Sequence, residues 1–107
     1  MAINVALVDE NGNVQKQLGF PVSLTVSRRL PGYDAADFPY LRFIDPYGDT
    51  VSNRVQMIPF LTEWRRLITL RATEGVSEEE EQNLREVEDL ALECSRGIHL
   101  YLKFIGD

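Results

Sequence analysis

Hydrophobic and polar residues alternate in two stretches near the ends of the chain, and each stretch predicts a β-strand. In residues 3–8, Ile3, Val5 and Leu7 fall on one face, and only Val8 breaks the strict alternation. Residues 98–105 alternate most regularly, with apolar members Ile98, Leu100, Leu102 and Phe104. We therefore expect two strands, each with one buried face.

Three further stretches are interpreted as strands. Asn11 and Gly12 form the strongest short hairpin signal, because both residues tolerate positive φ, so residues 14–18 should return antiparallel to the first strand. Residues 40–44 carry apolar atoms on both faces and predict a central strand. After a turn at residues 45–49, residues 50–55 should pair back with it as a hairpin.

The segment between these hairpins is ambiguous. Residues 22–30 alternate at period two with β-branched side chains, which favours a strand. Pro21, however, also suits the first position of a short helix ending at Leu30. Residues 31–39 read as a loop, the longest in the chain.

Two amphipathic helices are predicted between residues 59 and 97. The first opens at Pro59 and ends at Gly75, with Glu63, Arg65 and Arg66 on its outward side. Its apolar stripe comprises Phe60, Leu61, Trp64, Leu67, Ile68 and Ala72. The second starts with a capping box of Ser77 and Glu80 and stops at Gly97. Its stripe comprises Leu84, Val87, Ala91 and Cys94, widened by Leu90 and Leu92.

These elements predict an α+β fold. Five or six mostly antiparallel strands should form the sheet, and the two helices should pack as a hairpin on one of its faces. A chain of 107 residues is too short to divide into two parts that each bury a core, so residues 1–107 are expected to form one domain.

Two segments resemble a group of small bacterial proteins of unassigned function. They are LRFIDPYGDT, followed by Asn53, Arg54, Gln56 and Met57, and the closing stretch YLKFIGD. The resemblance covers the second half of the chain best. It implies a shared fold and carries no activity.

Charge and cysteine content narrow the function classes. The formal net charge of −6 disfavours nucleic acid and anionic membranes and is compatible with a basic protein partner. A single cysteine, Cys94, excludes an intramolecular disulfide, and its place on a helical apolar stripe predicts a buried, unreactive thiol. The amino-terminal residues lack the pattern of a signal peptide or membrane span, so a cytoplasmic location is expected.

One dense polar cluster surrounds the turn at residues 45–49. Asp45 and Asp49 are expected to cap the turn and to pair with Arg42 and Arg54. The alternative is an acid–base pair or a site for a hard cation such as magnesium. The candidate partner or ligand residues are Arg42, Asp45, Tyr47, Asp49, Asn53, Arg54, His99 and Tyr101.

His99 is the only histidine, and no second catalytic or metal-ligating group accompanies it in the sequence. Its expected neighbours on one strand face are Tyr101, Lys103, Arg42 and Tyr40. We interpret that face as an uncovered surface for dimerisation or partner docking.

The sequence contains no recognisable cofactor, metal or catalytic motif. We therefore expect a non-catalytic cytoplasmic protein-interaction module, comparable with an immunity protein or an adaptor, that binds a protein partner or itself. The alternative is a small enzyme or ligand binder whose site combines Asp45 and Asp49 with Arg42, Arg54 and His99.

Overall fold

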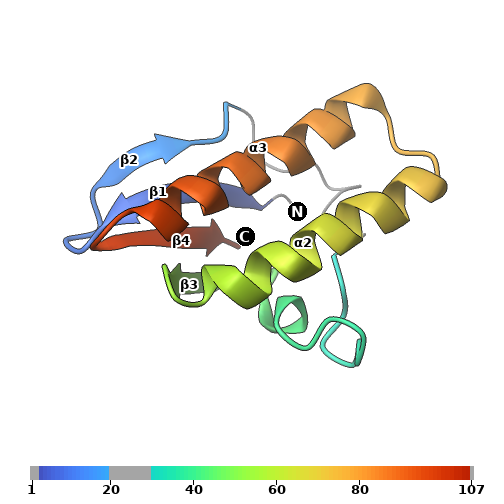
Figure 1. Cartoon of the computed structure of the whole chain (residues 1–107), viewed down its shortest axis with the longest axis horizontal. Helices are drawn as coiled ribbons and strands as arrows, with labels where there is room; N and C mark the ends of the chain where they lie inside the picture. Colours follow the sequence, from blue (N-terminus) through green and yellow to red (C-terminus); the bar gives the residue numbers. More distant parts are fainter. Residues whose placement is uncertain (1–2, 20–29, 107) are drawn as a thin grey trace.

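The computed structural model of the chain describes residues 3–19 and 30–106, which form a sheet with two helices packed on one face (Figure 1). In chain order the elements are β1 (Asn4–Asp9), β2 (Val14–Gln17), the 3-10 helix η1 (Leu41–Phe43), β3 (Asp49–Asn53), α2 (Met57–Thr73), α3 (Glu78–Arg96) and β4 (Leu100–Ile105). The predicted α+β class is confirmed, and so is the helical hairpin on one face of the sheet. Residues 22–30, whose strand or helix assignment the sequence left open, lie outside the described residues except for Leu30.

The sheet of the described residues has four antiparallel strands in the order β2-β1-β4-β3. β4 is central: Phe104 lies opposite Val5 of β1 on one side and Thr50 of β3 on the other. The expected five or six strands are not found there. The main reason is that residues 40–44, predicted as a central strand, contain η1 instead.

A buried carboxylate explains why residues 40–44 do not form a strand. Glu63 of α2 accepts hydrogen bonds from the backbone N–H groups of Tyr40 and Leu41, at 3.0 Å. These bonds satisfy amides at the start of η1 that a strand would direct to a neighbouring strand. The prediction that Glu63 faces outward was therefore wrong, since this residue is buried. Without a strand at 40–44, β3 pairs with β4.

The predicted hairpin of β1 and β2 is confirmed. Gly12 has φ of 83°, and the Asp9 carboxylate accepts hydrogen bonds from the backbone N–H groups of Asn11 and Asn13, both at 2.9 Å. These bonds, led by those from Asn13, hold the pKa of Asp9 below its ordinary value because they favour the charged form. The turn is therefore fixed by its own side chains.

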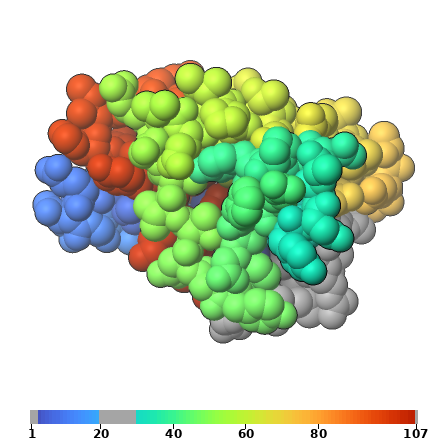
Figure 2. Space-filling view, turned by 90° about the horizontal axis from the view of Figure 1, so that it is seen from below, coloured from blue at the N-terminus to red at the C-terminus, as the bar shows by residue number. Residues whose placement is uncertain are grey.

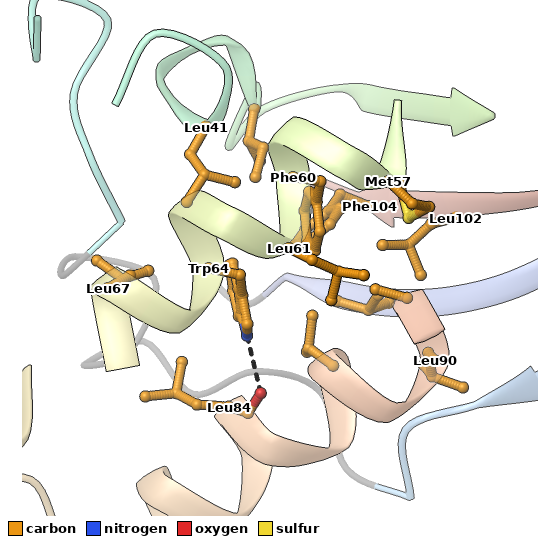
Figure 3. Packing of buried hydrophobic residues seen from close by; sticks show 14 of the residues in the cluster. Leu41, Met57, Phe60, Leu61, Trp64, Leu67, Leu84, Leu90, Leu102 and Phe104 are labelled. Atoms are coloured by element: carbon orange, nitrogen blue, oxygen red, sulfur yellow. Dashed lines mark hydrogen bonds between the residues drawn. The ribbon is translucent and has the colours of Figure 1, made fainter. Parts of the chain in front are cut away.

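The core lies between the helices and the sheet (Figure 3). Trp64 is fully buried, and its indole N–H donates to the carbonyl of Leu84 at 2.8 Å, which links α2 to α3. Phe60 stacks on Trp64 with ring centres 5.4 Å apart, and Phe104 of β4 contacts both rings. The interpretation of Trp64 as a core residue is confirmed.

The helix boundaries follow the sequence signals closely. α2 begins at Met57, two residues before Pro59, and Gly75 follows its end with φ of 80°. At the start of α3 the Ser77 hydroxyl accepts from the backbone N–H of Glu80 at 3.1 Å, as the capping box predicts. α3 ends at Arg96, directly before Gly97.

The last strand is shorter than predicted. β4 starts at Leu100, whereas Ile98 is exposed and His99 has φ of 60°, outside the strand region. His99 therefore does not share a strand face with Tyr101 and Lys103. Arg42 and Tyr40 do not join them either, because both lie in or beside η1.

Candidate functional site

A cavity of about 480 Å³ opens beside the turn that follows η1. Two segments that are separate in sequence line it, residues 30–33 and residues 42–47. We refer to this site as the aromatic cavity. Its volume falls in the range of pockets that hold small ligands or a partner's side chains.

The wall formed by residues 42–47 is anchored to α2. Besides the Glu63 bonds to η1, the guanidinium of Arg66 lies over the ring of Phe38, 4.6 Å from its centre. The hydroxyls of Tyr40 and Ser52 are hydrogen-bonded, which ties the same segment to β3. Burial raises the pKa of Tyr40. The wall is therefore held in place before any ligand arrives.

The turn at residues 45–48 closes through its own polar groups, as expected. Asp45 accepts from the backbone N–H of Tyr47 at 2.9 Å, and its own N–H donates to the hydroxyl of Thr50 at 3.0 Å. Gly106 packs directly on the turn, and its N–H donates to the carbonyl of Gly48 at 2.8 Å. The expected pairing of Asp45 with an arginine is not seen among the described residues.

Three exposed aromatic rings surround the opening. Tyr33 is 85% exposed, Tyr47 73% and Phe43 65%. The guanidinium of Arg42 lies over the Phe43 ring, 4.9 Å from its centre, and its buried Nε atom has no hydrogen-bond partner among the residues that the structure describes. The site thus combines apolar ring surface with an unsatisfied N–H donor.

The structure brings together only part of the predicted site. Arg42, Asp45 and Tyr47 line the aromatic cavity. Asp49 does not line it, and its carboxylate lies 3.5 Å from the ammonium group of Lys103 in β4. Asn53 exchanges hydrogen bonds with Gln56 at the start of α2. Arg54 is exposed and has no ion pair within residues 3–19 and 30–106.

His99 lies far from the turn. It precedes β4, whereas Asp49 is opposite Ile105 at the other end of that strand. A strand advances about 3.3 Å per residue, so the two ends lie roughly 17 Å apart. His99 Nδ1 is instead 3.4 Å from the carboxylate of Glu10, and Tyr101 lines a shallow hollow beside the β1–β2 turn. The proposed combination of His99 with Asp45 and Asp49 is therefore not one site.

Sequence reasoning missed several residues of the aromatic cavity. They are Leu30, Pro31, Gly32, Tyr33, Phe43, Ile44 and Pro46. Two features of the sequence could have indicated these residues. Tyr33 directly follows Pro31 and Gly32, and Phe43 lies beside Arg42 just before the turn at residues 45–49. Neither feature places residues 30–33 in one cavity with residues 42–47, because that requires the fold.

The remaining chemistry of the described residues is limited. Within residues 3–19 and 30–106, no three side chains of the metal-binding types gather closely enough to hold an ion. Neither α2 nor α3 is long and apolar enough to cross a membrane. Burial raises the pKa of the Cys94 thiol to about 11, so the thiolate form is disfavoured.

Comparison of the chain with protein-family models, with curated proteins and with solved structures found no match. The resemblance to small bacterial proteins through the LRFIDPYGDT and YLKFIGD segments stays a prediction.

Proposed function

We propose that the chain is a non-catalytic cytoplasmic protein-interaction module, and that the aromatic cavity is where it contacts a partner protein. The observation that carries this proposal is the exposure of Tyr33, Phe43 and Tyr47 around one opening. Aromatic residues and arginine are enriched at the centres of protein interfaces, where each side chain buries a large area at a low entropic cost.

The anchoring of the cavity wall supports the same function. Glu63 and Arg66 fix the segment that carries Arg42 and Phe43, so little ordering is required when a partner binds. An acidic chain of net charge −6 also attracts a basic partner at long range. An immunity-type inhibitor or an adaptor fits these features.

The test is an affinity capture from cells of the organism that encodes the chain, with three baits. They are the wild type, a Phe43→Ala/Tyr47→Ala variant, and a control Val14→Ala/Leu70→Ala variant. The control removes two exposed apolar side chains that do not line the cavity. We expect a partner recovered in stoichiometric amounts by the wild type and the control, and reduced at least about tenfold with the cavity variant.

Two results would contradict the proposal. One is a stoichiometric partner that the cavity variant retains fully, which would place binding elsewhere on the chain. The other is the absence of any stoichiometric partner, both from cells and from a peptide library displayed on phage. If a partner is recovered and purified, isothermal titration calorimetry with the Phe43→Ala and Tyr47→Ala single variants would give the loss of binding free energy for each ring separately.

A second candidate function is a small-ligand binder at the same cavity. Within residues 3–19 and 30–106 the Nε atom of Arg42 has no hydrogen-bond partner, and the guanidinium of this residue lines the cavity, where an acidic ligand would pair with it. The check is an NMR titration with benzoate and with inorganic phosphate. Saturable shifts of residues 42–47 that disappear in an Arg42→Gln variant would support it, and shifts unchanged by that variant would exclude it.

A further inference from the structure

β3 forms one edge of the described sheet, and its backbone has unused hydrogen-bonding groups. The bond from Gly106 to the carbonyl of Gly48 fixes which residues face β4. Since backbone direction alternates along an antiparallel strand, Asp49, Val51 and Asn53 direct their N–H and C=O groups outward. The Asn53 N–H is bonded to Gln56, whereas the outward groups of Asp49 and Val51 have no partner among the described residues.

This edge lacks the features that usually block strand addition. Lysine, proline and bulges commonly protect exposed edges. The opposite edge strand, β2, carries Lys16 and pairs with β1 through a bulged register. β3 contains none of these features, and its one charged residue, Asp49, is paired with Lys103 of its neighbour β4. Figure 2 views the molecule from the β3 side of the sheet.

The sequence of β3 is complementary to itself in one antiparallel register. With Val51 at the centre, Asp49 of one copy falls opposite Asn53 of the other, and two-fold symmetry repeats the pairing. The two Val51 residues would exchange both backbone hydrogen bonds, and each Asp49 N–H would meet a free carbonyl of Asn53. Asp49 of one copy and Asn53 of the other would lie on the same face of the joined sheet, so the side-chain amide of Asn53 would meet the Asp49 carboxylate.

We propose that β3 pairs with β3 of a second copy of this chain, which joins the two sheets across a two-fold axis at Val51. The occupant of this edge is then a second copy, because the Val51 register sets each Asp49 opposite Asn53 of the other copy and places no like charges opposite each other. This dimer uses a different surface from the aromatic cavity and does not depend on the proposed function.

The first test is sedimentation velocity over a range of concentrations, with Val51→Lys as the variant and Val14→Lys as the control. Val51 is 53% exposed and Val14 54%, and each lies on an edge strand, so the two changes are matched. We expect the wild type and the Val14 variant to dimerise from the 12.2 kDa monomer, with at least a tenfold higher dissociation constant for Val51→Lys. A monomer at every concentration, or equal dimerisation of both variants, would overturn the proposal.

A carboxylate at position 53 tests the register. Asn53→Asp should weaken the dimer severalfold, because it sets carboxylates opposite each other on both sides of the axis, while it keeps an acceptor for the N–H of Gln56. An unchanged dissociation constant would contradict the pairing of Asp49 with Asn53 across the axis.

A cysteine at position 51 tests the geometry without relying on charge. The Cβ atoms of a hydrogen-bonded antiparallel pair lie about 5.5 Å apart, too far for a direct disulfide but within reach of a short thiol-to-thiol cross-linker. Val51→Cys should therefore form a linked dimer with a short bismaleimide, whereas Val14→Cys should not. The native Cys94 is buried and does not compete. Equal linking of both variants, or none with Val51→Cys, would refute the two-fold axis.

Discussion

Both carboxylate oxygens of Glu63 accept a hydrogen bond from the backbone N–H of Tyr40, each at 3.0 Å. One of them also accepts from the N–H of Leu41. The helix α2 thereby holds the start of η1, and through η1 it positions Arg42 and Phe43 at the aromatic cavity.

Replacing Glu63 should therefore loosen this wall. Glu63→Ala leaves the amides of Tyr40 and Leu41 without their acceptor, and we expect a loss of about 1–3 kcal/mol in the free energy of unfolding. Hydrogen exchange of these two amides should accelerate more than that of β4. Thr62→Ala, a change at an exposed position on the same helix, is the control and should alter neither measurement appreciably.

Gly106 should tolerate no larger residue. A Cβ atom there would lie 2.5 Å from the backbone N and O of Gly48, so Gly106→Ala must displace the turn at residues 45–48. We expect a cost of about 1–3 kcal/mol in urea denaturation and shifted NMR signals for Asp45 and Tyr47. At Gly19 a Cβ atom meets nothing within 4 Å. Gly19→Ala should therefore leave the free energy of unfolding and the NMR signals of the turn unchanged. Equal effects of the two variants would contradict the close packing at Gly106.

Trp64 should report on the junction of the two helices. It is the only tryptophan and is fully buried, so its fluorescence should be blue-shifted in the folded chain and move to the red on unfolding. Trp64→Phe removes the hydrogen bond to Leu84 and leaves unfilled volume, which should cost about 1–3 kcal/mol in urea denaturation. A change near zero in the free energy of unfolding would show that neither the hydrogen bond nor the filled volume contributes to stability.

Stability should fall in alkaline solution because of Cys94. Burial raises the pKa of its thiol from 9.0 to about 11 in the folded chain. Between these values the unfolded chain has released the proton and the folded chain retains it, so the unfolded state binds fewer protons and stability decreases as pH rises. The full effect is about 2–3 kcal/mol.

The measurement is urea denaturation at several pH values for the wild type and Cys94→Ala. The variant should be less stable at neutral pH, and its stability should decline less between pH 9 and 11. Parallel declines of the two proteins would show that other groups cause the loss.

The sequence predicted the elements whose pattern is long and regular. The helices were recognised from their apolar stripes and from Ser77, Gly75 and Gly97, and the hairpin at Gly12 from local turn chemistry. Local signals suffice in these places because tertiary contacts reinforce them.

Residues 40–44 were predicted wrongly because their conformation depends on a distant partner. A five-residue, mostly apolar segment fits a strand or a helical turn equally well, and here Glu63 of α2 decides between them. Glu63 itself was read as an outward-facing charge, since its helix position alone does not reveal the backbone amides that it meets.

The candidate site was predicted only in part for the same reason. Arg42, Asp45 and Tyr47 are close in sequence and lie together, so the dense turn was a correct pointer. His99 was grouped with them because Arg42 and Tyr40 were expected to share its strand face. Residues 40–44 instead contain η1, and His99 lies at the opposite end of the sheet.

The central place of β4 has a consequence for biosynthesis. β1 and β3 both pair with β4, so neither can join the finished sheet while residues 100–105 are still inside the ribosome. Until residues 100–105 emerge, the apolar faces of the β1–β2 hairpin and of the two helices stay without this strand. The native sheet therefore forms only after residues 100–105 have left the ribosome, and a stop before Leu100 would leave β1 and β3 without their shared partner strand.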